Sequence, residues 1–417
     1  MEKLIIKNFG PIKNATIQIA KFTLLIGHTA TGKSTVAKLL CIFNSEKFYY
    51  LETSSDIAEF MSLLEEYSIL YEFTENTFIE YSNDYYTWTI TAKGINTDYN
   101  YGTAFKSLSL IPMVTVKNIS RIVDLASENE EINNYIQASG FGTEQPSQYM
   151  VEEKNKFPWR DVIEGVCNIL FKGSRATYIP AERNLFAIMK KNIFSIANSG
   201  LSIPKSLIAF GAYYEQAKAV QGNTFRIPFL KARIHFNEEI GEDMLLEKGS
   251  EIPLSNASSG YQSLVPLYTV MEFFCNLNHR LQGKTKFPLL VIEEPELNLF
   301  PSVQKELIQE IVKGINYTNC KTIIASHSPY VLSVIDTLVQ AGNVAKDKQK
   351  VERVKEVFKE EYWIDFDDVE CYYFNQRGMV KSVKNNKLKI IGANVLDEIS
   401  EDLNSKYDQL LDIKYNE

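Results

Sequence analysis

The sequence has 417 residues and a formal net charge of −8, with 45% hydrophobic and 23% charged residues. This composition is typical of a globular chain of about two or three domains, or of one large domain with insertions, and excludes a wholly disordered or collagen-like chain. The acidic balance argues against a surface that coats nucleic acid everywhere, but leaves room for a local basic groove. We expect a cytoplasmic protein without membrane attachment, because the sequence shows no long apolar run, signal peptide or CxxC pair.

Strands and helices are predicted to alternate along most of the chain. In the first part we expect strands at 4–7, 15–20 and 22–26, the last two continuous, then a helix at 33–43, an antiparallel meander at 70–105 and a largely helical segment at 107–173. In the second part we expect a strand at 176–180, helices within 184–220, a hairpin at 229–254 and a helix at 263–281. These are followed by a strand at 289–292, a helix at 302–313, a strand at 321–325 and a helix from 329. The last expected elements are a charged helix or linker at 342–361, a hairpin at 369–391 and a helix at 394–413.

A glycine-bounded loop between the strand at 22–26 and the helix at 33–43 matches the pattern GxxxxGK[ST]. Its glycines let backbone N–H groups surround phosphates, and the helix N-terminus adds positive potential. Lys33, in a solvent-facing loop, is expected to reach the β- and γ-phosphates of ATP, and Ser34 to bind Mg²⁺. The predicted nucleotide-binding residues of the loop are Gly27, His28, Thr29, Ala30, Thr31, Gly32, Lys33, Ser34 and Thr35.

A second motif is the apolar strand at 289–292, which is followed directly by Glu293 and Glu294. A buried parallel strand would deliver both carboxylates to its C-terminal edge, beside the phosphate loop. Glu293 then holds Mg²⁺, and Glu294 orients the attacking water as the catalytic base. The plain alternative is an acidic turn after a core strand.

Two further segments could contact phosphate. Ser258, Ser259 and Gly260 precede an apolar helix, where hydroxyls and free N–H groups form an anion site, although a simple serine N-cap is the default for such a segment. His327 follows the strand at 321–325 and could touch a γ-phosphate, unless it is an ordinary loop histidine.

The order of these motifs along the chain resembles that of the ABC-type ATPases, with 258–262 similar to their signature loop. The segments 6–12, 294–301 and 325–330 resemble the RecF, SMC and OLD branch, which is AAA15-like. The chain departs from that pattern in three places: Glu293 replaces the usual Asp, the signature lacks its second Gly, and no Gln stands at the Q-loop position. Glu182 or Arg183 could fill the Q-loop role of sensing the γ-phosphate, or could instead form a surface salt bridge.

This resemblance implies an α/β P-loop NTPase fold of the ABC-ATPase type. It has a mixed central sheet, an antiparallel β subdomain, and a helical subdomain that carries the signature loop. The expected parts are an ATPase core at 1–45, a β meander and helical insertion at 46–175, a Q-loop-like strand, helical lobe, hairpin and signature loop at 176–262, an ATPase core at 263–341, and a C-terminal hairpin and helix at 342–417.

The same resemblance implies ATP and Mg²⁺ as cofactors. It also implies Glu294, His327 and Lys33 as catalytic residues, and a homodimer or higher oligomer that shares composite ATP sites. The whole chain is similar to stand-alone ATPases of bacterial antiphage systems, such as the ATPase subunit of PARIS and related retron or Septu ATPases. In those families the ATPase is a nucleotide-driven clamp or sensor that controls a separate effector, such as a nuclease or toxin.

Two further observations bear on this interpretation. Asp365, Asp367 and Asp368 mimic the DxD of a Toprim nuclease, but they precede a strand, which favours an acidic loop. A RecF-like DNA repair ATPase remains the alternative function, with DNA binding left open. The segments 6–12 and 294–301 argue against a transporter subunit.

Overall fold

The computed structural model describes residues 2–45, 48, 57–83, 86–99, 176–189, 203–221, 224–230, 232–237, 241–247, 249–280, 289–318, 320–392 and 405–410. The segment at 107–173 that was predicted to be helical lies outside these ranges. None of the helices within them is both long and apolar enough to span a bilayer.

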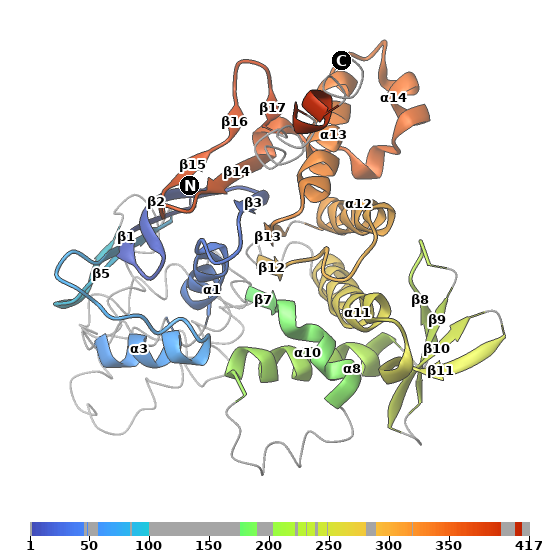
Figure 1. Cartoon of the computed structure of the whole chain (residues 1–417), viewed down its shortest axis with the longest axis horizontal. Helices are drawn as coiled ribbons and strands as arrows, with labels where there is room; N and C mark the ends of the chain where they lie inside the picture. The colour runs from blue at the N-terminus through green and yellow to red at the C-terminus, as the bar shows by residue number, and fades with distance from the viewer. Residues whose placement is uncertain are drawn as a thin grey trace, which may run out of the picture.

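A six-stranded sheet forms the centre of the molecule (Figure 1). In spatial order its strands are β15 (Val380–Ser382), β14 (Val369–Phe374), β3 (Phe22–Gly27), β13 (Lys321–Ser326), β12 (Leu289–Glu293) and β7 (Ala176–Ile179). All neighbours pair in parallel except β15, which is antiparallel to β14, so the predicted mixed sheet is confirmed. Strands β3 and β12 are buried along their whole length, because helices and a second sheet cover both faces.

The side chains of β3 alternate between two hydrophobic cores. Leu24 packs on the side of α11 (Ser259–Arg280), α12 (Pro301–Tyr317) and α13 (Pro329–Ala345). Leu25 packs on the opposite side, with α1 (Lys33–Phe43) and the N-terminal sheet. Figure 1 shows α1 on one side of the central strands and α11 and α12 on the other. The central sheet therefore lies between two layers.

The N-terminal sheet is antiparallel, with the strand order β2-β1-β4-β5-β6. Its members are β1 (Glu2–Phe9), β2 (Ile12–Ile19), β4 (Phe78–Ser82), β5 (Tyr86–Thr91) and β6 (Gly94–Tyr99). The predicted meander is thus confirmed, and α3 (Ile57–Glu66) precedes it. The prediction that 15–20 continues into 22–26 is wrong, because β2 and β3 belong to different sheets and the chain crosses between them at 20–21.

The region before the signature segment contains helices within 184–220, as predicted. The described residues form η4 (Ala181–Asn184), α8 (Leu185–Met189) and α10 (Lys205–Gln221). The predicted hairpin belongs to a four-stranded sheet of β8 (Thr224–Arg226), β9 (Arg233–Asn237), β10 (Glu242–Glu247) and β11 (Ser250–Pro253). The short turn η6 (Leu254–Asn256) then leads into α11.

The C-terminal part contains α14 (Val351–Val357) and the short turns η7 (Glu360–Tyr362) and η8 (Phe366–Asp368). The predicted hairpin at 369–391 is two ribbons, because β16 (Lys384–Asn385) and β17 (Ile390–Ile391) pair separately from β14 and β15. Of the helix predicted at 394–413, the described residues 405–410 are helical.

Candidate active site

The phosphate-loop motif forms the connection from β3 to α1, and its two glycines are required there. Gly27 has φ 144°, and a Cβ atom at this position would overlap the carbonyl oxygen of Phe374 on β14. Gly32 has φ 100° and is the N-cap of α1, where a Cβ atom would lie 2.6 Å from Cγ1 of Ile12. Since only glycine fits both conformations without strain, β14 and the turn after β1 together fix the shape of the loop.

Lys33 points into this loop rather than into solvent. Its ammonium donates to the carbonyl oxygens of Gly27 at 2.8 Å and His28 at 2.6 Å, and the residue is 7% exposed. The loop is exposed at 28–30 and at Ser34, as expected, but the expectation that Lys33 itself lies outside the buried interior is wrong. Burial lowers the pKa of Lys33, while the nearby carboxylates of Glu294, Glu296 and Glu293 oppose that shift. The result is a cation held inside the concave face of the loop.

The other loop residues divide into exposed and internal side chains. The exposed residues are His28, Thr29, Ala30 and Ser34. Thr31 donates its hydroxyl to the carbonyl of His28 at 2.8 Å, and the hydroxyls of Thr35 and Tyr71 lie 3.3 Å apart. The two buried threonines therefore brace the loop, and a direct nucleotide contact by either remains a prediction.

Glu293 ends β12 and is 4% exposed. Its side chain is hydrogen-bonded to the hydroxyl of Tyr178 on the adjacent strand β7, while its Oε1 atom has no partner within the described residues. Burial raises the pKa of Glu293 to about 7. A buried carboxylate with an unsatisfied oxygen at a strand end is a suitable ligand for a cation.

The side chain of Glu294, the next residue, points in a different direction from that of Glu293. Its φ of 43° is unusual for a residue with a side chain, and its N–H donates to the carbonyl of Ala325 on β13 at 2.8 Å. Its Oε1 lies 3.5 Å from Nδ1 of His327. The hydrogen bond between the two lowers the pKa of Glu294 and raises that of His327. An ionised, half-exposed carboxylate is thereby held at the C-terminal edge of the sheet.

Glu296 is a site residue to which the sequence analysis gave no role. It is 6% exposed, and its Oε1 accepts from the hydroxyl of Ser326 at 2.7 Å and from the N–H of His327 at 2.9 Å. These bonds tie the segment after β12 to the end of β13. The Glu-Pro-Glu sequence at 294–296, which places a second glutamate two residues after Glu294, was the signal in the sequence that could have identified Glu296.

Arg183 also differs from expectation. It is fully buried, and its guanidinium donates to four backbone carbonyls, those of Pro180, Ser263, Glu293 and Glu294. The surface salt bridge considered for this position is therefore wrong for Arg183. Because its side chain is engaged inside the protein, it does not fit a γ-phosphate sensor, whereas the exposed Glu182 remains a candidate for that role.

The signature segment is separate from these groups. Ser258 and Ser259 are exposed, and Gly260 lies beside the loop after β12, where an added Cβ would be 3.0 Å from the carbonyl oxygen of Asn298. Gln262 holds the segment in shape by donating to the carbonyls of Ser255 and Ala257. Within the described ranges, no hydrogen bond or ion pair joins 258–260 to the loop at 27–35.

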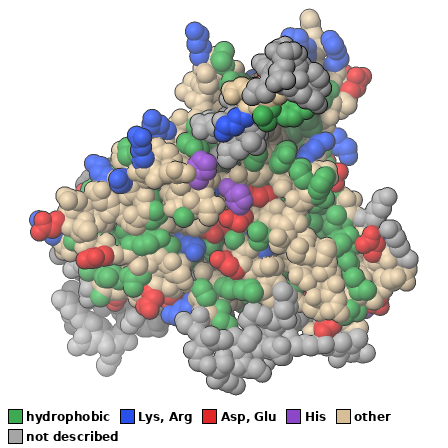
Figure 2. Space-filling view, viewed as in Figure 1, with side chains coloured by type: hydrophobic (Ala, Val, Ile, Leu, Met, Phe, Trp, Pro, Cys, Tyr) green, Lys and Arg blue, Asp and Glu red, His purple; other side chains and the backbone are tan. Residues whose placement is uncertain are grey.

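The predicted catalytic residues Lys33, Glu294 and His327 do meet at one edge of the central sheet. In the space-filling view, histidine and acidic side chains lie together near the middle of the face shown (Figure 2). Among the described residues, no cluster of three or more His, Cys, Asp or Glu side chains could hold a metal by itself. A Mg²⁺ ion bound with a nucleotide takes several ligands from phosphate and water, so the Ser34 hydroxyl and the orphaned Glu293 oxygen fit that ion chemically.

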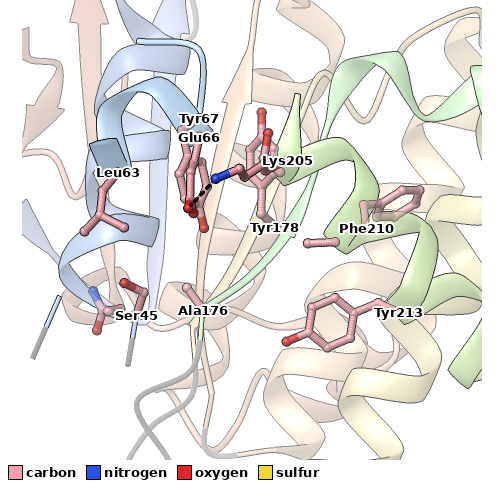
Figure 3. A pocket seen from close by; sticks show the side chains of 12 residues that line it. Ser45, Leu63, Glu66, Tyr67, Ala176, Tyr178, Lys205, Phe210 and Tyr213 are labelled. Atoms are coloured by element: carbon pink, nitrogen blue, oxygen red, sulfur yellow. Dashed lines mark hydrogen bonds and ion pairs between the residues drawn. The ribbon is translucent and has the colours of Figure 1, made fainter. Parts of the chain in front are cut away.

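A pocket of about 290 Å³ lies between the end of α1, α3, β7 and α10 (Figure 3). Tyr67, Tyr178 and Tyr213 line it, and the ion pair of Lys205 with Glu66, 3.0 Å apart, closes one side. Tyr178 therefore borders the pocket while bonding to Glu293.

The nuclease-like aspartates have a structural role. Asp365 caps η8 by accepting from the N–H of Asp367 and pairs with Lys346 at 2.9 Å. These contacts favour the acidic loop over a Toprim centre.

A phosphate loop with its lysine, a buried strand ending in two carboxylates, and a strand-end histidine define a P-loop ATPase. The sequence matches the model of the AAA ATPase domain family (AAA_15) over residues 1–206 and 189–332. The chain belongs to that family, and the α/β P-loop fold predicted from the sequence is confirmed.

Solved structures similar to this chain include heads of SMC proteins and a recombination mediator. The Smc head domain of Pyrococcus furiosus, solved with the C-terminal domain of ScpA, has 12% identity and a TM-score of 0.36 over 96% of this chain and 100% of that chain. The SMC head of Thermotoga maritima has 12% identity and a TM-score of 0.34, over 80% and 90%. RecF of the RecFOR pathway with ATPrS has 12% identity and a TM-score of 0.31, over 91% and 97%. No curated protein matches the sequence.

Proposed function

We propose that this chain is an ABC-type ATPase in which two copies close around two ATP molecules. The observation that carries this proposal is the meeting of Lys33, Glu294 and His327 at one edge, while Ser258 and Ser259 stay exposed elsewhere on the surface. Serines at the start of a long helix can bind a γ-phosphate, and here that phosphate would belong to the ATP bound at the phosphate loop of a second copy. Each site would then be composite.

We assign the following roles within one site. Lys33 would exchange its two loop carbonyls for phosphate oxygens, and Ser34 and Glu293 would hold Mg²⁺, which would supply charge neutralisation at the phosphates. Glu294 is ionised and half exposed, so it can orient and deprotonate the attacking water. His327, fixed by Glu296, keeps Glu294 in place and faces the same opening.

Exposed aromatic residues support the closure of two copies. Phe300, 75% exposed, follows the loop that contacts Gly260, and Tyr330, 52% exposed, follows the His327 segment. One exposed aromatic side chain near the signature segment and one near the His327 segment suit two surfaces that become covered, because aromatic residues are enriched in the buried parts of interfaces.

We further propose that nucleotide-driven closure controls a separate effector protein, such as a nuclease or toxin, in antiphage defence. Support comes from the sequence resemblance and from the capping role of Asp365, which favours an acidic loop over a nuclease centre at the DxD-like segment. The effector, its trigger and any DNA contact belong to this proposal.

The deciding experiment compares Lys33→Ala with Glu294→Gln. Lys33→Ala should lose ATP binding, because the cation inside the loop is removed. Glu294→Gln should bind ATP with near-normal affinity, turn it over about 100-fold more slowly, and accumulate as an ATP-bound dimer in light scattering.

Wild-type turnover in Glu294→Gln would contradict the assigned base. Turnover per chain that stays constant on dilution, with single chains in light scattering, would contradict the composite site. Stimulation by duplex DNA would favour the RecF-like repair alternative, whereas co-purification of a small nuclease or toxin would favour defence.

A further inference from the structure

Arg183 lies where three parts of the proposed ATPase meet. Its Nε donates to the carbonyl of Ser263 at 3.0 Å, in the second turn of the signature helix α11. Its Nη1 donates to the carbonyls of Pro180 at 3.0 Å and Glu293 at 2.8 Å, and its Nη2 donates to that of Glu294 at 2.7 Å. One rigid, planar group thus joins the end of β7, the end of β12 and the start of α11.

These contacts differ from an ordinary buried ion pair. The side chain is fully buried, and all four acceptors are backbone carbonyls rather than carboxylates. Burying a guanidinium is costly, so a position that serves only packing would be better filled by an apolar residue. What the arginine supplies here is geometry, because the fork fixes the two peptide groups that flank the Cα of Glu294.

Glu294 needs such support because its backbone is unusual. Its positive φ is a sparsely populated conformation for a residue with a side chain, and such conformations persist only where neighbours hold them. The carbonyl of Glu294 is fixed by Arg183, and its N–H by Ala325. The direction in which its carboxylate points therefore depends on both contacts.

We infer that Arg183 is a positioning residue that couples the start of the signature helix to the catalytic base Glu294. This inference rests on the proposed function. When Ser258 and Ser259 engage a γ-phosphate, any displacement at the start of α11 reaches the Glu294 peptide through one guanidinium plane. Glu294 then takes its hydrolytic position only when the composite site is closed.

The test is a pair of double-mutant cycles. Arg183→Lys keeps the charge but loses the planar fork, so ATP affinity should stay within about threefold of the wild type while kcat falls on the order of 100-fold. In the Glu294→Gln background the same change should cost less than about threefold, because the group that it positions is already gone. In a Ser259→Ala background, which removes one signature hydroxyl but should keep measurable turnover, Arg183→Lys should also cost less than it does in the wild type.

A matched control is Thr322→Val, which removes a buried hydrogen bond from β13 to the carbonyl of Leu290 on β12 without touching the end of β12. It should lower the melting temperature but leave kcat close to that of the wild type. If Arg183→Lys does not fold, Arg183→Gln, which keeps a short planar donor, takes its place in both cycles.

Equal losses of kcat with and without Glu294→Gln would overturn the positioning role, and an equal loss of kcat with and without Ser259→Ala would overturn the coupling to α11. Both results leave the proposed function standing as long as Glu294→Gln alone is slow. A fast Glu294→Gln variant would instead remove the proposed function, and this inference with it.

Discussion

Two neighbouring glutamates at the end of β12 have opposite electrostatic properties. Glu293 is buried, and burial raises its pKa to about 7. Glu294 is half exposed and hydrogen-bonded to His327, which lowers its pKa. The backbone causes the difference, because the positive φ of Glu294 turns its side chain away from the strand and towards the end of β13. One position thus suits a cation and the next suits a base.

The pair of His327 and Glu294 should show in a pH titration. By NMR, the pKa of the His327 ring should lie above its ordinary value of 6.5, and Glu294→Gln should return it towards 6.5. Because the pKa of His327 is raised, the stabilisation that protonated His327 gives the folded state is complete below about pH 6.5 and is lost as the pH rises further. Because the pKa of Glu294 is lowered, the stabilisation that ionised Glu294 gives is complete only above its ordinary pKa of 4.5. Glu294→Gln should therefore destabilise most between about pH 4.5 and 6.5. A histidine pKa that does not respond to Glu294→Gln would contradict the pairing.

The sequence predicted those site residues that lie at the end of an apolar strand or in the loop that follows it. Lys33, Glu293, Glu294 and His327 stand after apolar runs, and parallel strands bring their C-terminal ends to one edge. The roles of Arg183, Tyr178 and Glu296 could not be predicted in this way. Arg183 acts through carbonyls, and Tyr178 through a partner on a neighbouring strand, so their contacts depend on pairings that no local pattern contains.

At the scale of elements, most strands and helices were predictable because hydrophobic runs and glycine turns mark them. The sequence did not, however, predict the sheet to which each strand belongs. Strands β2 and β3 are separated by two residues, yet they lie in different sheets, and β3 pairs with β13 and β14 from the C-terminal part. A local apolar pattern indicates burial but not the identity of the partner strand.

Packing of α13 gives a prediction at this scale. Gly342 lies inside the helix, and a Cβ at this position would overlap the carbonyl oxygen of Ile364. Gly342→Ala should gain about 1 kcal/mol in helix propensity and lose more to the overlap, for a net destabilisation of about 1–3 kcal/mol. Ser333→Ala, on the exposed side of the same helix, is the control and should be neutral or slightly stabilising. A Gly342→Ala variant more stable than wild type in urea unfolding would show that the 363–365 segment moves away freely.

At the scale of the whole molecule, the proposed composite site predicts that a single copy is incomplete, because its exposed signature serines would complete the site of a second copy. Lys33→Ala removes the phosphate-loop half of a site, and Ser259→Arg should block the signature half from outside. Ser259 is a better position than Gly260, whose close approach to the Asn298 carbonyl would confuse the result with damage inside the same chain. Each variant alone should be inactive. A mixture should recover roughly a quarter of wild-type turnover, because half of the randomly mixed dimers contain one intact composite site.

The control for this mixture is Lys33→Ala mixed with Glu294→Gln, which places both defects on the phosphate-loop side and should recover nothing. Recovery in this control would mean that the mixture restores turnover by some route other than a shared site. Substantial ATP turnover by Ser259→Arg alone would mean that the signature serines do not face the nucleotide.

The order of strands in the central sheet has a consequence for synthesis of the protein. Strand β3 is made within the first 27 residues, but its two neighbours in the finished sheet begin at residues 321 and 369. At about 5–20 residues per second, β3 waits roughly 20–70 s on the ribosome before β14 emerges to cover its outer edge. Until β13 is made, late in this interval, this buried strand and the loop after it have no native sheet partner. Nascent chains should therefore bind neither ATP nor antibodies against the folded protein until translation passes β14, and this interval is when a chaperone would be needed most.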